Sequence, residues 1–133
     1  MGLSSSTYNS HLMRTLEIKI RAGAKPGQTV VELVGALELQ QVFAFQAMMR
    51  EDESAVTILD MSAITYVDSA GIGALVNANV SRQRRGRKLA IAGITERART
   101  VLEVTKTAQF FDFYPTATEA EEKVLPDAEA ASA

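Results

Sequence analysis

The segment from residue 68 to residue 73, Asp-Ser-Ala-Gly-Ile-Gly, constrains the fold of this chain more than any other. It follows two apolar runs, residues 56–59 and 64–67, and it opens a long stretch with helical spacing. Asp and Ser are strong N-cap residues, because a side-chain oxygen can accept a hydrogen bond from a free amide of the first turn. The segment therefore predicts a helix that begins beside Ser69, directly after an apolar strand.

The first turn of this predicted helix is made of unusually small residues, including Ala70, Gly71 and Gly73. Each glycine costs a helix about 1 kcal/mol relative to alanine, so the two glycines need a reason other than helix formation. One reason is a close crossing of the helix over a strand, and the other is the approach of a partner surface. A serine hydroxyl at the positive end of a helix could carry a phosphate or meet a protein, or it could simply cap the helix.

The length of 133 residues predicts a single domain, which we place at residues 14–125, after a flexible leader (1–13) and before a disordered tail (126–133). The net charge of −2 argues against general nucleic-acid binding. The absence of cysteine excludes disulfides and thiolate metal sites and is compatible with a reducing compartment. No apolar run approaches the ~20 residues of a membrane span.

The order of predicted elements is β-β-α-β-α-β-α-β-α, which indicates an α/β fold. Strands at 14–21 and 29–37 form a hairpin around Pro26-Gly27, and further strands lie at 55–61, 89–92 and 110–114. Helices begin near Leu39, at Ser69, at Thr95 and at Thr116 or Thr118, and Gly86 ends the second of them. We expect a mixed sheet, parallel in its later part, with helices packed against it. Helical spacing is shown in the first helix by Leu39, Val42, Phe43, Phe45, Gln46 and Met49, and Ile72, Leu75, Val76, Asn79 and Val80 trace one face of the second. The expected inward positions of the last two helices are Ala98, Val101, Leu102, Val104, Ala120 and Val124.

Residues 57–75, TILDMSAITYVDSAGIGAL, resemble the signature of STAS domains, and within these the bacterial anti-sigma factor antagonists. The likeness extends from about Leu16 to Val124. It implies a cytoplasmic regulator that binds an anti-sigma factor, which is a serine kinase, and that is released when the kinase phosphorylates Ser69. It also implies an opposing serine phosphatase. One departure is Gly35-Ala36-Leu37-Glu38, where such proteins often have Gly-Glu-Leu-Asp.

We expect a docking surface at the start of the Ser69 helix, because small residues open it and apolar and amide side chains follow. The partner-binding residues of this surface are Glu38, Asp68, Ser69, Ala70, Gly71, Ile72, Gly73 and Asn79. Asp60, Asp68 and Glu38 are expected to gather near Ser69 and to help a kinase orient the hydroxyl. The chain's single histidine, His11, lies in the leader, and no phosphate-binding Gly-rich loop is present, so we expect no catalysis, no metal and no cofactor.

A second cluster is basic and contains Arg82, Arg84, Arg85, Arg87 and Lys88. We interpret it as a solvated helix end that complements the helix dipole, not as a nucleic-acid surface, because no aromatic residues are interleaved with it. Two alternatives to the antagonist function stay open. The chain could be a STAS scaffold module of a larger sensory or transport assembly, or a small nucleotide- or anion-binding domain that uses the Ser69 helix end.

Overall fold

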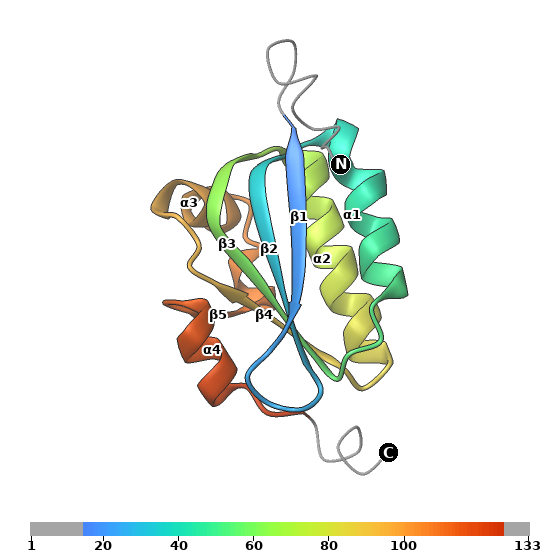
Figure 1. The fold of residues 1–133 in the computed structure, drawn as a ribbon. Coiled ribbons are helices and arrows are strands. Elements are labelled where there is room, and N and C mark those ends of the chain that lie inside the picture. The colour runs from blue at the N-terminus through green and yellow to red at the C-terminus, as the bar shows by residue number, and fades with distance from the viewer. Residues whose placement is uncertain (1–14, 127–133) are drawn as a thin grey trace.

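The computed structural model describes residues 15–126, in which five strands form one mixed sheet with helices on both faces (Figure 1). The spatial order is β1-β2-β3-β4-β5, with β1 antiparallel to β2 and every later pair parallel. The strands are β1 (Leu16–Ala22), β2 (Gln28–Leu37), β3 (Val56–Val67), β4 (Lys88–Ala92) and β5 (Asp112–Tyr114). The predicted α/β class and mixed sheet are confirmed. The expected leader and His11 lie outside the described residues, as does nearly all of the expected tail.

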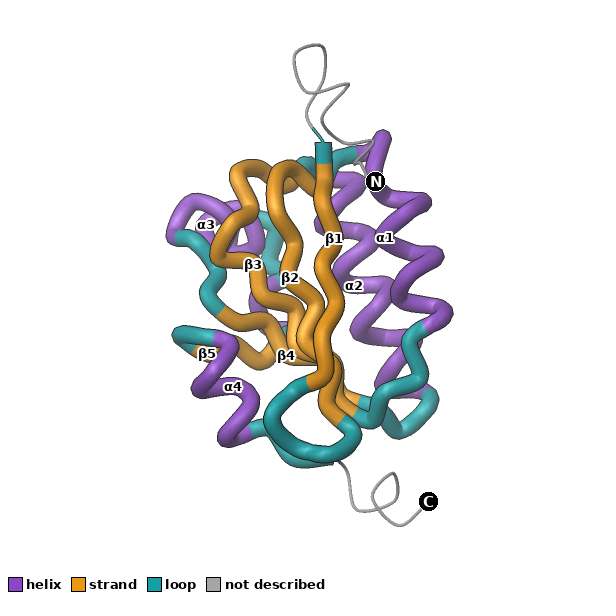
Figure 2. The backbone as a smooth tube through the Cα atoms, viewed as in Figure 1, coloured by secondary structure: helices purple, strands orange, loops and turns teal. Residues whose placement is uncertain are grey.

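Three helices cover one face of the sheet and the fourth covers part of the other (Figures 1 and 2). On the first face lie α1 (Leu39–Glu51), α2 (Ser69–Arg84) and α3 (Glu96–Val104), and α4 (Ala117–Lys123) lies on the second. A short 3-10 turn, Ala108–Phe110, precedes β5. Within residues 15–126, none of the helices has the length and apolar character that a membrane crossing requires.

The central strand β3 separates two apolar cores. Leu59 and Met61 point toward α1, α2 and α3, whereas Val56 and Ile58 point toward α4. A strand buried on both faces is typical of a parallel sheet with helices on each side. The apolar runs at 56–59 and 64–67 form one strand of 12 residues, longer than the predicted strand at 55–61, and it ends immediately before Asp68. This continuity places the start of α2 at one end of the sheet.

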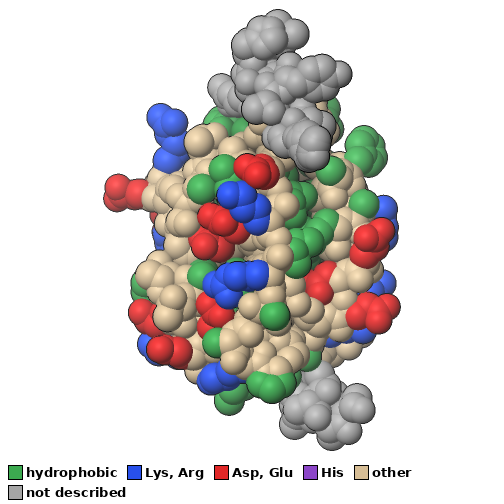
Figure 3. All heavy atoms as spheres, viewed as in Figure 1, with side chains coloured by type: hydrophobic (Ala, Val, Ile, Leu, Met, Phe, Trp, Pro, Cys, Tyr) green, Lys and Arg blue, Asp and Glu red, His purple; other side chains and the backbone are tan. Residues whose placement is uncertain are grey.

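Charged and polar contacts attach α4 to the hairpin of β1 and β2. Arg21 donates two hydrogen bonds to the carboxylate of Glu121, at 3.1 and 2.9 Å. The bond from Arg21 lowers the pKa of Glu121, although burial of the carboxylate raises it. Gln28 donates to the backbone carbonyl oxygens of Glu121 and Val124 at the end of the helix. The face of the molecule seen in Figure 3 exposes side chains of both charge signs.

The helix ends follow the predicted signals more closely than the helix faces do. Thr95 and Thr116 cap α3 and α4, and Gly86 follows α2 with φ +71°, as expected of the residue that ends it. The expected burial of Val104 is wrong, and of the helically spaced residues of α1 only Val42, Phe45 and Met49 are buried. The side chains that are exposed instead are Leu39 (62%), Phe43 (77%), Val80 (36%) and Val104 (75%).

Candidate functional site

Ser69 is the first residue of α2 and is exposed, while the preceding residue caps the helix. An oxygen of the Asp68 carboxylate, Oδ1, accepts a hydrogen bond from the Gly71 amide at 2.8 Å. The interpretation of Ser69 as the cap is therefore wrong. The Ser69 hydroxyl lies at the positive end of a 16-residue helix and takes no part in the capping bonds.

Asp68 also joins the starts of α1 and α2. Its second carboxylate oxygen, Oδ2, accepts from the Leu39 amide at 3.1 Å, and its own amide donates to the Leu37 carbonyl oxygen at 3.2 Å. Both carboxylate oxygens are thus bonded to backbone amides of two different helices. Asp68 fixes the position of Ser69 relative to α1, and its carboxylate is committed to this structural role.

The two glycines of the first turn have different environments. Gly71 is buried, and a Cβ placed on it would collide with the backbone carbonyl oxygen of Leu37. The close crossing of α2 over the end of β2 therefore accounts for Gly71. Gly73 is exposed, and a Cβ there would meet no atom within 4 Å. Packing within residues 15–126 gives no reason for glycine at this second position.

A shallow, mainly apolar groove begins beside Ser69 and runs between α2 and the turn after α3. Its volume is about 500 Å³, and we call it the α2–α3 groove. Gly73 leaves part of its wall bare, and Thr105 and Thr107 form the opposite rim. The groove is lined by Ser69, Ile72, Gly73, Val76, Asn77, Val80, Thr105 and Thr107.

The expected exposure of Asn79 is wrong. Asn79 is only 4% exposed, and its side-chain amide donates to the Phe110 carbonyl oxygen. Asn79 therefore holds the 3-10 turn against α2. Ile72 is also largely buried, although part of its side chain lines the α2–α3 groove. Glu38 is half-buried at the residue before α1, where its side chain makes no capping bond.

The carboxylates expected to gather near Ser69 are only partly brought together. Glu38 and Asp68 lie at the ends of neighbouring strands, but Asp60 lies far along β3. At about 3.3 Å per residue, Asp60 is more than ~20 Å from the end of the strand. Its carboxylate instead accepts bonds from the amide and hydroxyl of Ser62, at 3.1 and 2.8 Å. Across residues 15–126, no group of three or more His, Cys, Asp or Glu side chains is placed to hold a metal ion.

A buried ion pair that was not predicted from the sequence lies at the other end of α2. Arg82 is 4% exposed and lies 2.6 Å from the Asp52 carboxylate. Arg82 is therefore not part of a solvated cluster, and the Asp52 side chain beside it is only 12% exposed. The signal that indicates this burial is spacing, because Leu75, Ala78 and Arg82 share one helix face.

The chain is similar to known proteins in sequence pattern and in fold. A family model described as "STAS domain" matches residues 15–120. The unphosphorylated anti-sigma factor antagonist SpoIIAA superposes with a TM-score of 0.67 at 14% identity, over 80% of this chain and 95% of that one. The phosphorylated form of SpoIIAA from Bacillus gives 0.65 at 15% identity, over 82% and 100%.

A sulfate transporter family protein from Wolinella succinogenes is about as similar in structure to this chain as the two SpoIIAA structures are. Its TM-score is 0.65 at 19% identity, over 72% of this chain and 85% of that one. No curated protein sequence matches the chain. At these identities the structural likeness shows a shared fold, and the family match itself covers most of the sequence. The chain therefore belongs to the STAS domain family.

Proposed function

We propose that this protein is a bacterial anti-sigma factor antagonist whose binding is switched by phosphorylation of Ser69. Unmodified, it binds an anti-sigma factor in the cytoplasm, and a sigma factor is then free to act in transcription. The anti-sigma factor is also the serine kinase that modifies Ser69, and a serine phosphatase restores the binding form. The observation that carries this proposal is the exposed Ser69 hydroxyl at the start of α2, beside the α2–α3 groove.

The docking surface in this proposal is apolar and continues onto α1. Val76 and Val80 line the groove, and Gly73 lets a partner approach the helix backbone. Leu39, whose amide is bonded to Asp68, exposes 62% of its surface, and Phe43 exposes 77% one turn later. Exposed apolar side chains of this kind mark interaction surfaces in soluble domains. Ser69 lies where such a partner would also cover Ala70 and Ile72.

The residues expected to bind a partner then divide into two groups. Ser69, Ala70, Ile72 and Gly73 contribute to the docking surface directly, and Glu38 lies at its edge. Asp68, Gly71 and Asn79 act indirectly, because they set the position of α2.

Phosphorylation at this position acts by charge. A phosphate adds about −1.5 to −2 charges at neutral pH. In a free domain it stays hydrated and lies near the free amides of the first turn. Beneath a partner it would be desolvated against apolar side chains, at a cost of several kcal/mol, or more than about a hundredfold in affinity.

Affinity capture from the native host tests the proposal, with the full chain as bait. We expect an anti-sigma factor kinase to bind the unmodified protein and the Ser69→Ala variant. We expect it to be lost from the Ser69-phosphorylated protein and weakened by Ser69→Asp. Thr118→Asp, which adds the same charge at an exposed position of α4, is the matched control and should bind normally. Equal capture by the phosphorylated and unmodified forms would overturn the proposal.

A second function is favoured by the similarity to the sulfate transporter family protein. The domain would then be a STAS module within a larger transport or sensory assembly. In that case the same capture would recover membrane transport or receptor proteins, and the Ser69 peptide would carry no phosphate. Mass spectrometry of the partners and of this peptide separates the two functions.

A further inference from the structure

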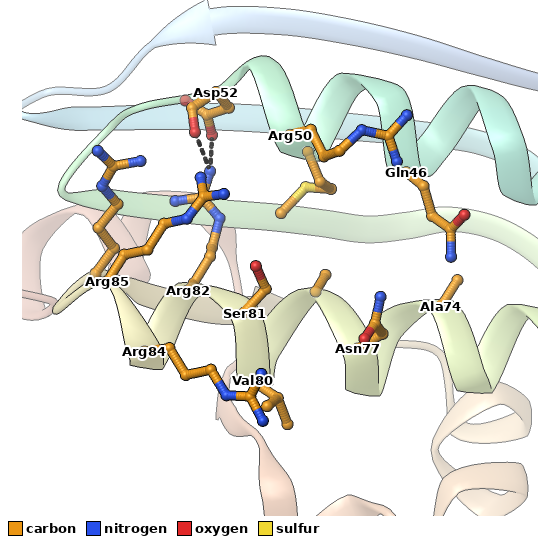
Figure 4. A pocket seen from close by; sticks show the side chains of 13 residues that line it. Gln46, Arg50, Asp52, Ala74, Asn77, Val80, Ser81, Arg82, Arg84 and Arg85 are labelled. Atoms are coloured by element: carbon orange, nitrogen blue, oxygen red, sulfur yellow. Dashed lines mark hydrogen bonds and ion pairs between the residues drawn. The ribbon is translucent and has the colours of Figure 1, made fainter.

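A cavity of about 250 Å³ lies between the C-terminal halves of α1 and α2 (Figure 4). Five arginines line it: Arg50 from α1, Arg82 and Arg84 from α2, and Arg85 and Arg87 after α2. Figure 4 shows Arg82 reaching from α2 toward Asp52, with Arg50 on the opposite helix. This arrangement concentrates positive charge between two helices of a chain whose net charge is −2.

The guanidinium of Arg82 is buried but not fully hydrogen-bonded. One terminal nitrogen donates to the backbone and side chain of Asp52, at 2.9 and 2.6 Å. The other donates to the Ser54 carbonyl oxygen at 3.2 Å. The Nε atom of Arg82 is buried and has no hydrogen-bond partner. A buried cationic donor without an acceptor is unfavourable, so the charge of Arg82 is only partly offset by its protein contacts.

The charges around the cavity are also unbalanced. Asp52 is the one carboxylate in its lining, and Arg82 already pairs with it. Within residues 15–126, no carboxylate forms an ion pair with Arg50, Arg84, Arg85 or Arg87. Burial lowers the pKa of Arg82 most strongly, and the charges of Arg87 and Arg85 lower it further against the opposing effect of Asp52. The arginines therefore repel one another across this space.

Helix-dipole compensation explains only part of the cluster. It accounts for cations in the last turn of α2, such as Arg84. It accounts equally for Arg50 in the last turn of α1. It does not explain why these side chains line one cavity together with Arg85 and Arg87, which follow α2. An anion in the cavity would accept from the exposed guanidinium groups of Arg50, Arg84 and Arg85, and it would offset the charge of the whole cluster.

We propose that this cavity binds a small phosphate-type anion, of the size of a phosphate or diphosphate group. Arginine favours such ligands because its planar fork of donors matches phosphate oxygens. The volume lies below the roughly 300–1,000 Å³ of pockets that enclose drug-sized ligands, so it fits the charged group and not a whole larger molecule. A nucleic-acid duplex fits poorly, because Arg82 is too deeply buried to contact a duplex backbone.

This site is separate from Ser69. Ser69 begins α2 and Arg82 lies in its last turn, so at about 1.5 Å per residue they are about 20 Å apart. Anion binding in the cavity and docking at the α2–α3 groove can therefore succeed or fail independently.

Titration of the full chain with pyrophosphate, followed by ¹H–¹⁵N NMR at low salt, tests the proposal. We expect saturable binding in which the backbone amide signals of lining residues such as Arg50, Ser81 and Arg85 shift with the bound fraction. Sodium chloride at the same ionic strength should cause no saturable shift. A parallel titration with ADP distinguishes the sources of the group: tighter binding than pyrophosphate indicates a nucleoside-borne diphosphate, and weaker binding indicates the free anion.

Charge-removing variants locate the site. Arg50→Gln and Arg85→Gln should each weaken pyrophosphate binding at least fivefold. Arg97→Gln removes the same charge from an exposed position of α3 and should bind as the unchanged protein does. Absence of saturation, equal weakening by Arg97→Gln, or binding of duplex DNA in place of pyrophosphate would each overturn the proposal.

Discussion

A terminal guanidinium nitrogen of Arg82 lies 2.6 Å from a carboxylate oxygen of Asp52, and the two side chains are only 5% and 12% exposed. This pair joins the C-terminal end of α2 to the loop after α1. At the other end, the Asp68 carboxylate joins the first turns of the same two helices through the Leu39 and Gly71 amides. Polar contacts thus fix α2 against α1 at both ends and leave the Ser69 hydroxyl outside them.

Removal of one charge from the buried pair should destabilise the domain strongly. Asp52→Asn leaves Arg82 buried without its counter-ion, and we expect the free energy of unfolding to fall by about 3 kcal/mol. Urea denaturation measures the change. Glu103→Gln, which breaks the exposed Arg99–Glu103 pair, is the control and should change the value by no more than about 0.5 kcal/mol. Similar losses in the two variants would show that burial does not matter to the pair.

The same pair should make stability depend on acid pH. Burial raises the pKa of Asp52, but hydrogen bonds from Ser54 and Thr57 and the charge of Arg82 together outweigh it and lower the pKa. Arg82, although its own pKa is lowered by burial, stays protonated far above this range, so Asp52 sets the pH dependence.

A carboxylate with a lowered folded-state pKa stabilises the fold above its unfolded pKa, about 3.9 for Asp, and this stabilisation is lost as pH falls through the folded value. We therefore expect the unfolding free energy to fall as the pH drops below about 4. Asp52→Asn should flatten this dependence, and the Glu121 carboxylate, whose pKa is also lowered, should account for part of what remains. Urea denaturation from pH 6 to pH 3 measures it, and an identical slope in the variant would contradict the assignment.

The two glycines of the first turn of α2 should respond oppositely to alanine. Gly71→Ala places a methyl group against the Leu37 carbonyl oxygen, which cannot move without shifting α2 from β2. We expect a loss of about 2 kcal/mol, as for other overpacked sites. Gly73→Ala meets no neighbouring atom and should stabilise the helix by about 0.5–1 kcal/mol. Denaturation of both variants decides this, and equal effects would disprove the crossing argument.

The parts of this structure that the sequence predicts are those set by local signals. Thr95, Gly86 and the Asp68-Ser69 segment mark helix ends by their own backbone chemistry, and the alternating apolar runs mark strands. The missed features depend on distant partners. Arg82 is buried because Asp52 and Ser54 accept from it, and Asn79 because it reaches the Phe110 carbonyl oxygen.

The exposed apolar residues were missed for a related reason. Phe43 is a large apolar residue of the kind found in protein cores. Only the packing of α2 and the sheet against the other face of α1 shows that its side chain points away from the core. Helical spacing alone predicts a broad hydrophobic face, and it does not show which residues at the edges of that face are buried. The candidate site was accordingly located at Ser69 from sequence, whereas its groove and its buried supports required the fold.

Phosphorylation of Ser69 should leave the fold nearly unchanged. The helix dipole favours a phosphate at this exposed position by about 0.3–1 kcal/mol. The neighbouring Asp68 carboxylate opposes it by a similar, screened amount, and Asp68 keeps its bonds to Gly71 and Leu39 because these use its own oxygens. With the net change below about 1 kcal/mol, the melting temperature should move by less than about 4 °C. Calorimetry of the phosphorylated protein, the unmodified protein and Ser69→Ala measures this shift. A much larger fall in the melting temperature would mean that the phosphate disrupts the start of α2, and loss of partner binding would then reflect unfolding of the surface and not repulsion across it.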